Sequence, residues 1–198
     1  SSESCPALRH CCACLRAATL GLLVNLLTAH ALPAAEPELP PLVTTSGSPR
    51  LPGKFIWADL VTGDLGAARR FYGKLFGWDF RDVGQGLSTY TIAFNGSRPL
   101  GGLVNARVRA GAVGGARWVA YVSVRDVNQA AHAVVASGGY QLVSTRRLPR
   151  RGEQAVFADT EGVVFGAMSS SAGDPEDFLA EPGDWIWITL LTRYAPTA

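Results

Sequence analysis

Cysteine and histidine are nearly absent from most of this sequence. All four cysteines lie within the first 14 residues, at Cys5, Cys11, Cys12 and Cys14. After His30 the sequence contains a single histidine, His132. Disulfide frameworks and thiolate metal sites need several such side chains close together. The sequence therefore excludes a disulfide framework and a thiolate metal site from the part beyond residue 30.

Charge of either sign is also scarce. Charged residues make up 17% of the 198 residues, and the formal net charge is +2. This balance does not favour nucleic acid or an anionic surface as a partner, so we expect no nucleic-acid binding. The chain has 22 glycines and a hydrophobic content of 47%, which is typical of a globular protein with short strands and tight turns. Its length allows one domain with extensions, or two small ones.

Residues 1–31 have the pattern of a signal peptide. Positive charge precedes a short apolar run at 17–27, and Ala29-His30-Ala31 provides small residues around a cleavage point. The apolar run is too short for a membrane span, so we expect no stable span in the mature chain. The prediction is a mature protein that starts near Leu32 and is exported, periplasmic or secreted. An uncleaved helical anchor or a misplaced start remains the alternative.

The next segment, 32–53, is rich in Pro, Ser and Gly. This composition predicts a linker without packed structure. From residue 55 the pattern changes to alternation, which places Trp57 and Asp59 on the same face of a strand. Asp64 then occupies the cap position of a helix predicted over 64–76, and Gly77 ends that helix.

The same order of elements recurs further along the chain. Asp126, which lies 62 residues after Asp64, caps a second predicted helix at 126–138. Three strands are predicted after each helix, at 80–83, 88–94 and 100–108 and then at 140–144, 155–159 and 163–168, with another strand at 118–124 before the second helix. This order indicates an internal repeat of a strand–helix–three-strand module.

The tail repeats the start of the first module. Residues 185–192 match residues 55–62, with Trp187 standing 130 positions after Trp57. No helix follows, so we interpret 172–198 as a linker plus the first strand of an incomplete second module. Exposed alternating tryptophans would form a sticky edge, and we therefore expect 185–192 to add as a strand to its own sheet or to a partner's.

Residues 57–78 carry the pattern W-x-D-L-x-T-x-D-x-x-A-A-x-x-F-Y, followed by L-F-G-W. This pattern resembles the glyoxalase/bleomycin-resistance/dioxygenase group, the vicinal oxygen chelate (VOC) superfamily. Asp126 and the turn at 157–162 add to the resemblance, which covers about residues 54–170. The group contains lyases, isomerases, dioxygenases, thiol transferases and drug-sequestering binders, so the resemblance specifies a fold and not a reaction.

The resemblance implies an α+β fold in which paired βαβββ modules form a curved sheet around a cleft, here over residues 54–171. In metal-dependent members, His, Glu or Gln ligands come from the first strand of each module and from late strands. The corresponding positions here are Trp57, Val119 and Gly166, and none has a side chain that binds a hard or borderline cation. We therefore expect no bound metal and no cofactor.

Asp59 is the candidate catalytic residue. A lone buried carboxylate is unfavourable unless it is paired, and carboxylates in clefts are frequent functional groups. Asp59 would act as a general base or bind a cationic group. In the alternative interpretation it is a structural carboxylate that is bonded to nearby backbone or to an arginine.

Four aromatic residues are candidates for a pocket that binds a planar ligand: Trp57, Tyr90, Trp118 and Tyr121. Ordinary core aromatics are an equally good interpretation of them. The alternation alone does not fix whether Trp118 or Val119 faces inward.

The basic group consists of Arg98, Arg117, Arg146, Arg147, Arg150 and Arg151. Its densest part, at 146–152, is predicted to be a loop. A solvated surface is the simplest interpretation, and holding an anionic substrate is the functional one, with Arg98 included among the ligand-binding candidates. His132 is predicted to face solvent on the second helix.

Three functions remain open at this point. The leading one is a glyoxalase-like domain that binds a small molecule in an aromatic cleft without its own metal. The second is a metal-dependent lyase or dioxygenase of the same superfamily. The third is a non-catalytic association module, and formation of a homodimer is left open.

Overall fold

The structure is a computed structural model that describes residues 38–44, 47–85, 89–105 and 115–192. All of these residues belong to the unit that comprises residues 34–198. The predicted signal peptide at 1–31 lies outside them, so its cleavage and export remain predictions. In the part of the chain that is described, no helix is long and apolar enough to cross a membrane.

The described residues form two βαβββ modules, so the predicted α+β architecture is confirmed. The first module contains β1 (Phe55–Thr62), α1 (Leu65–Phe76), β2 (Asp79–Val83), β3 (Tyr90–Asn95) and β4 (Arg98–Asn105). The second contains β5 (Arg117–Ser123), α2 (Val127–Ala136), β6 (Tyr140–Leu148), β7 (Gly152–Ala158) and β8 (Val164–Ser170).

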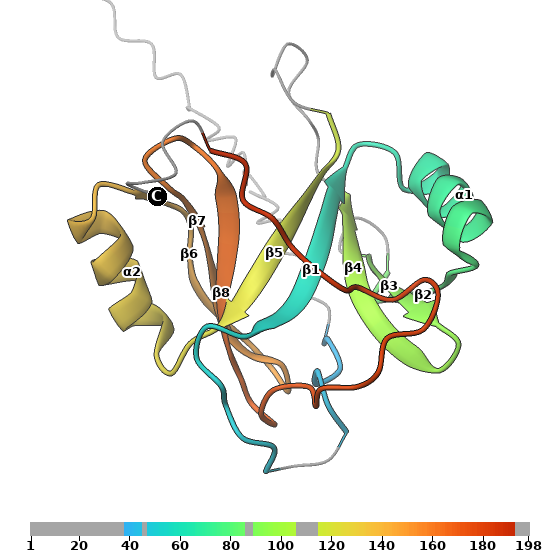
Figure 1. The fold of residues 1–198 in the computed structure, drawn as a ribbon, viewed down its shortest axis with the longest axis horizontal. Helices are drawn as coiled ribbons and strands as arrows, with labels where there is room; N and C mark the ends of the chain where they lie inside the picture. The colour runs from blue at the N-terminus through green and yellow to red at the C-terminus, as the bar shows by residue number, and fades with distance from the viewer. Residues whose placement is uncertain (1–37, 45–46, 86–88, 106–114, 193–198) are drawn as a thin grey trace, which may run out of the picture. The chain divides into compact units, whose positions relative to one another are not determined.

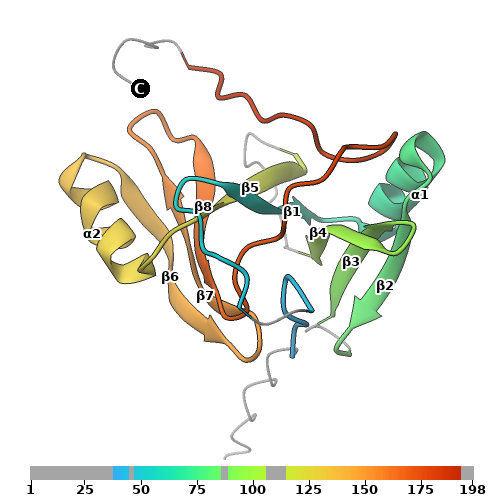
Figure 2. The ribbon, with the colours of Figure 1, turned by 60° about the horizontal axis from the view of Figure 1, so that its bottom comes forward.

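All strands join one mixed sheet in the order β2-β3-β4-β1-β5-β8-β7-β6. β1 and β5 pair antiparallel at its centre and link the two modules. Each of these strands also pairs parallel with the last strand of its own module, β1 with β4 and β5 with β8. The sheet is curved and open, with both helices on its outer side (Figures 1 and 2). This curvature gives the sheet an inner face.

Both helices begin where the aspartates predicted. The Asp64 carboxylate accepts a hydrogen bond from the Ala67 N–H at 2.8 Å. The Asp126 carboxylate accepts two, from Asn128 N–H at 2.7 Å and Gln129 N–H at 3.0 Å. Such caps satisfy N–H groups that have no partner within the helix. Gly77 ends α1 with a φ of 74°, a left-handed conformation that glycine adopts without strain.

Apolar side chains pack on both faces of the sheet. The inner-face cluster includes Ile56, Trp57, Tyr90, Ile92, Val119, Tyr121, Leu148 and Met168. On the outer face, one cluster lies under α1 and includes Leu60, Ala68, Trp78, Ala93, Leu100 and Leu103. Another lies under α2 and includes Val127, Ala155, Phe157 and Ala167. The sheet is therefore covered by helices on the outside only, which leaves the inner face to other segments.

The N-terminal segment 38–44 packs on that inner face, where Figure 2 shows it inside the curve of the sheet. Leu39 and Leu42 are each only 6% exposed and belong to the inner-face cluster. The expectation that 32–53 has no packed structure is therefore wrong for this part. Both side chains are large and apolar, so burying them on an uncovered sheet face is favourable even in a Pro-rich segment.

The C-terminal tail is held against the sheet without forming a strand. The described residues of 171–192 contain no strand, so the expected addition of 185–192 to the chain's own sheet is wrong. Instead, Trp78 Nε1 donates to the Gly183 carbonyl at 2.8 Å, and Trp185 Nε1 donates to the Leu100 carbonyl at 3.2 Å. In Figure 1 the tail then runs across the sheet toward the side of α2. Pairing with a partner's sheet remains a prediction.

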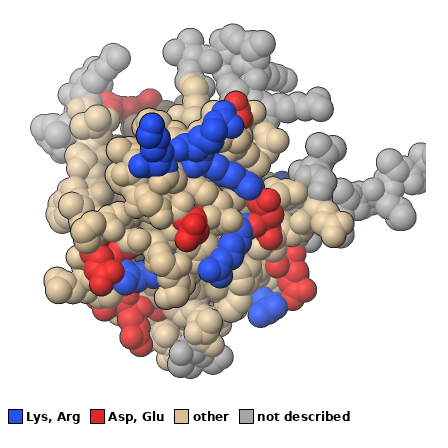
Figure 3. All heavy atoms as spheres, turned by 90° about the vertical axis from the view of Figure 1, so that its right-hand side faces the viewer, with Lys and Arg blue, Asp and Glu red and all other residues tan. Residues whose placement is uncertain are grey.

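Basic and acidic side chains lie side by side on the surface that Figure 3 shows. This surface is the right-hand side of Figure 1, where α1 and β2 are found. Arg69 of α1 forms an ion pair with Asp82 of β2, and both side chains are partly exposed. Exposed pairs of this kind contribute little to stability, about 1 kcal/mol or less. His132 is exposed on α2, as predicted.

Candidate functional site

A pocket of ≈ 700 Å³ lies between strands β1, β3 and β4, the N-terminal segment 40–44 and the tail. Its wall includes Trp57 from β1, Ile92 from β3, Arg151 from the β6–β7 turn and Phe178 from the tail. Residues 40–44 form a further side. The wall is therefore mostly apolar and aromatic, and it also carries the cationic residues Lys54, Arg98 and Arg151 and the acidic residues Glu176 and Asp177.

Behind the pocket wall lies a buried hydrogen-bond network centred on Asp59. Trp57 and Asp59 are two residues apart on β1 and share its inner face. Trp57 Nε1 donates to the Asp59 carboxylate at 2.9 Å, and the Tyr90 hydroxyl donates to the same oxygen at 2.5 Å. The Trp57 N–H also reaches the Tyr90 oxygen at 2.8 Å. The network fixes the indole and the phenol relative to each other.

Glycine makes room for this network. Gly102 of β4 lies opposite Asp59 in the register of the two strands. A Cβ at this position would overlap the Tyr90 hydroxyl and the Asp59 carboxylate. Gly101 meets the other strand as closely, because its Cβ would lie 2.6 Å from the Ala58 carbonyl oxygen. Gly101 thus lets the two backbones approach closely, and Gly102 leaves room for the Asp59 and Tyr90 side chains.

Burial sets the electrostatics of the network. Asp59 is 6% exposed, and burial raises the pKa of its carboxyl group. Hydrogen bonds from Tyr90, Trp57 and Tyr121 and the charge of Arg151 act in the opposite direction on that pKa. Burial also raises the pKa of the Tyr90 and Tyr121 phenols, so both remain protonated donors at neutral pH. The carboxyl is thus supplied with donors from three side chains.

Arg151 is the functional candidate that the sequence placed wrongly. The segment 146–152 was predicted to be a loop at the surface, but β6 continues to Leu148 and β7 starts at Gly152. Arg151 is 2% exposed, and its guanidinium lies 4.2 Å from the centre of the Trp57 ring. The alternation gives no sign of this, because the short turn brings the side chain back onto the inner face.

One predicted site residue, Trp118, lies away from the pocket, and another, Arg98, lines it in an ion pair. Trp118 is on the outer face, where its indole N–H donates to the Tyr72 hydroxyl at 3.0 Å. Val119 is the residue of β5 that faces inward, directly opposite Asp59. Arg98 does line the pocket, but its guanidinium is paired with the Asp184 carboxylate. Trp57, Asp59, Tyr90 and Tyr121 are the candidates that the fold brings together.

The positions of the expected metal ligands do not fit a metal. Trp57 gives its only polar group to Asp59 and Tyr90. The Tyr121 ring lies directly over Gly166. A Cβ added to this glycine would overlap the ring. Among the residues that the structure describes, no three His, Cys, Asp or Glu side chains gather in a way that could hold a metal ion. The absence of a metal remains a prediction.

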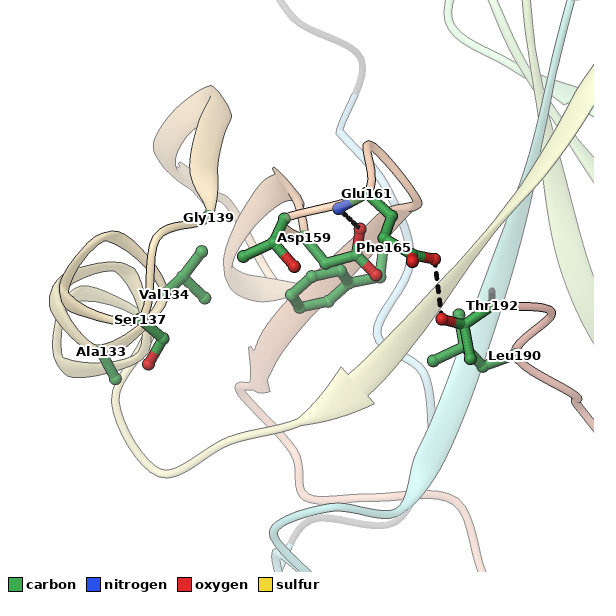
Figure 4. Close-up of a pocket in the computed structure, with 10 residues that line it drawn as sticks. Ala133, Val134, Ser137, Gly139, Asp159, Glu161, Phe165, Leu190 and Thr192 are labelled. Atoms are coloured by element: carbon green, nitrogen blue, oxygen red, sulfur yellow. Dashed lines mark hydrogen bonds between the residues drawn. The ribbon is translucent and has the colours of Figure 1, made fainter. Parts of the chain in front are cut away.

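A second pocket of ≈ 510 Å³ lies on the outer side, between α2 and the tail (Figure 4). It is lined by Val134 of α2, Phe165 of β8 and Leu190 of the tail, with Asp159 and Glu161 in the turn before β8. The backbone N–H of Glu161 donates to the Asp159 carboxylate at 2.9 Å, which closes that turn. This pocket contains none of the predicted site residues.

The family model of the Glyoxalase/Bleomycin resistance protein/Dioxygenase superfamily matches residues 54–166. The chain belongs to this superfamily. The match starts just before β1 and ends within β8, so it includes both modules and the whole Asp59 network.

The curated proteins that the chain matches are longer than the chain. It is 30% identical over 140 residues to a Mycobacterium tuberculosis protein named "Putative glyoxylase CFP32", which covers 69% of this chain and 53% of that protein. It is 26% identical over 159 residues to the "Anthracycline biosynthesis protein DauV" of Streptomyces sp. (strain C5), which covers 74% of this chain and 58% of that protein. The chain spans about half the length of these curated relatives.

A solved structure of methylmalonyl-CoA epimerase in complex with methylmalonyl-CoA and NH4+ matches with a TM-score of 0.46 and 16% identity. The match covers 64% of this chain and 100% of that chain.

Proposed function

We propose that this VOC-superfamily domain binds a small aromatic molecule in its inner pocket, without a metal ion of its own. The observation that carries the proposal is the pocket of ≈ 700 Å³, whose wall includes the Trp57 side chain and is mostly apolar. Hydrogen bonds to Asp59 and Tyr90 fix the indole in place. A rigid aromatic surface loses little entropy when a planar ligand stacks on it.

Binding is favoured over catalysis because of where Asp59 lies. Asp59 is not among the residues that line the pocket, and the Trp57 and Tyr90 side chains occupy one of its oxygens. A general base must come within hydrogen-bond reach of the proton it removes. The geometry supports a positioning role for Asp59, through which Trp57 and Tyr90 keep their orientation.

A binding measurement with a pocket variant tests this proposal. Ligand-observed NMR with a panel of bicyclic aromatic compounds would identify binders to the wild-type chain. Trp57→Leu removes the stacking surface and should weaken the best binder about tenfold or more, since aromatic stacking contributes about 0.5–1.5 kcal/mol beyond the area it buries. Circular dichroism and a thermal melt would establish that the variant is folded.

The matched control is Phe71→Leu on α1. Phe71 is also aromatic, but it is 60% exposed on the outer side of the sheet. This variant should bind the same compound with unchanged affinity. The proposal fails if no compound binds to the wild-type chain, or if both variants lose affinity equally.

A further inference from the structure

The turn between β6 and β7 holds Arg151 rigidly at the pocket. Its backbone N–H donates to the Leu148 carbonyl at 3.1 Å, and its carbonyl accepts from the Ser171 N–H at 3.0 Å. The preceding residue, Arg150, has a φ of 66°, which is unusual for a residue with a side chain. These constraints turn the Arg151 side chain inward, while Arg150 remains at the surface.

The Arg151 guanidinium lies over aromatic rings, and only one hydrogen bond from its two terminal nitrogens is found. It lies 4.2 Å from the centre of the Trp57 ring and 5.9 Å from that of Tyr90. Its Nη1 reaches the Pro40 carbonyl at 3.4 Å, near the upper limit for a hydrogen bond. Its Nη2 is buried and has no hydrogen-bond partner. The contact with the aromatic rings satisfies no N–H group, so Nη2 keeps unused hydrogen-bonding capacity.

The other two cations on the pocket wall are already neutralised. Lys54 forms an ion pair with Asp177 at 2.6 Å, and Arg98 is paired with Asp184. No carboxylate among the described residues pairs with Arg151 in this way. Asp59 acts on it only at longer range, and the donors described above surround that carboxyl. Arg151 is therefore the cation of this wall that has hydrogen-bonding capacity left.

A buried charged group with an unmade hydrogen bond is costly, and an added acceptor relieves that cost. Arginine matches the planar geometry of carboxylates with two parallel N–H groups. We propose that Arg151 is the anchor for the carboxylate of an aromatic acid whose ring lies in the apolar part of this pocket. This inference rests on the proposed function, because it adds a chemical class to the ligand of the same pocket.

The N-terminal segment covers this anchor. Leu39 and Leu42 are buried on either side of Pro40, and the Pro40 carbonyl supplies the acceptor that Arg151 Nη1 reaches. A ligand carboxylate would replace that long hydrogen bond to a neutral carbonyl with shorter ones to a charged acceptor that matches the guanidinium geometry. The segment consequently competes with the ligand for the guanidinium.

The test compares 2-naphthoate with its neutral analogue 2-naphthamide by isothermal titration calorimetry on the full chain. Wild type should bind the acid about tenfold or more tightly than the amide, because the acid alone gives Arg151 a charged acceptor. In Arg151→Gln this preference should disappear, with amide affinity within about threefold of wild type. Arg151→Lys keeps the charge and should retain part of the preference, so it serves as the variant if Arg151→Gln is poorly folded.

Two further variants sharpen the test. Arg69→Gln removes a paired cation that does not line the pocket and should leave the acid-over-amide ratio unchanged. Leu42→Ala loosens the covering segment and should tighten acid binding in wild type, but not in the Arg151→Gln background. If wild type binds acid and amide equally, Arg151 is not the anchor, although the proposed aromatic pocket is not contradicted. The same conclusion follows if the acid-over-amide ratio is unchanged in Arg151→Gln. If neither compound binds to any variant, the anchor and the proposed function both fall.

Discussion

At the scale of single residues, Asp59 is the carboxyl on which the hydrogen bonds of the inner face converge. The alternation of β1 is enough to predict that Asp59 and Trp57 share a face. It does not predict their contact with Tyr90, because Tyr90 comes from β3 and its hydroxyl reaches Asp59 across β4, at the glycine position 102. The contact is possible because Gly102 has no side chain. The sequence shows that position 102 is a glycine, but it does not show that the Tyr90 hydroxyl and the Asp59 carboxylate occupy the space beside it.

The raised pKa of Asp59 gives stability a specific pH dependence. Between the ordinary carboxyl value, about 3.9, and the raised value, the folded protein holds a proton that the unfolded chain has released. The contribution of Asp59 to the free energy of unfolding is therefore greatest at low pH and falls as the pH rises through that window. Tyr90, Tyr121 and Arg151 also face the carboxyl, and none of them changes charge in this range.

Asp59→Asn removes this titration and keeps an acceptor for Trp57. We expect the unfolding free energy of the variant, minus that of wild type, to rise with pH through the window and to level off above it. Urea denaturation at a series of pH values measures this difference. Asp64→Asn is the control, since Asp64 is an exposed helix cap and asparagine caps equally well. Parallel curves for wild type and Asp59→Asn would contradict the prediction.

Gly102→Ala tests the space above the network. The added methyl group would overlap the Tyr90 hydroxyl and the Asp59 carboxylate, so one of them has to move. We expect a loss of about 1–3 kcal/mol in the free energy of unfolding, measured with urea. Gly115→Ala is the matched control, because nothing lies within 4 Å of the position of its Cβ. Its effect should be about 1 kcal/mol or less in either direction. Equal effects of the two substitutions would show that Tyr90 is not held as described.

At the scale of elements, the same alternating pattern forms a strand in β1 and no strand in the tail. Residues 185–192 repeat the alternation of β1, yet they form no strand among the described residues. Trp185 is half-buried against Trp78 and Trp118, with ring centres 6.0 Å and 5.0 Å away. Trp187, which the alternation places on the same face as Trp185, is 80% exposed. The tail is therefore held by the Trp185 indole together with side-chain hydrogen bonds and ion pairs, and not by a row of strand hydrogen bonds.

The two tryptophans provide a matched pair of substitutions. Trp185→Ala removes the packing against Trp118 and the hydrogen bond to the Leu100 carbonyl, and should reduce the unfolding free energy by roughly 1.5–3 kcal/mol. Trp187→Ala should change it by about 0.5 kcal/mol or less. Thermal or urea denaturation of both variants measures this. If Trp187→Ala costs as much as Trp185→Ala, the tail uses both indoles, as a strand would.

The helices and most strands could be predicted because their signals are local. Asp64, Gly77 and Asp126 mark helix ends, and each marker lies within a few residues of the end it specifies. The covering of the inner face by Leu39 and Leu42 could not be predicted in this way. Their burial depends on a sheet face that forms more than ten residues later, and the local composition is that of a linker. The tail and Arg151 were misplaced for the same reason.

At the scale of the whole described unit, the pocket is assembled from parts that are distant in the sequence. Residues 40–44, strands β1 and β3, the β6–β7 turn and residues 175–178 all contribute to its wall. Lys54 connects two of these parts, since its ammonium group reaches the Pro175 carbonyl at 2.6 Å as well as Asp177. The pocket should therefore open when either terminal segment detaches, even if the sheet remains intact.

Removal of divalent ions tests the function at this scale. A metal that binds only the folded state would stabilise it by about 2.7 kcal/mol at a concentration 100 times its dissociation constant. Because the ligand positions do not fit a metal, we expect dialysis against EDTA to leave the Tm and the affinity for aromatic ligands unchanged. A Tm that rises on addition of Mn²⁺ or Zn²⁺ and returns with EDTA would contradict this expectation.

The glycine beneath the Tyr121 ring links this position to the Asp59 network. Gly166 stands where the resemblance to metal-dependent relatives places a glutamate, but Tyr121 fills the space that such a side chain would need. A glutamate at this position would have to displace the Tyr121 ring, and this would remove a hydrogen-bond donor from Asp59. A ligand side chain at position 166 and the present set of donors to Asp59 therefore exclude each other.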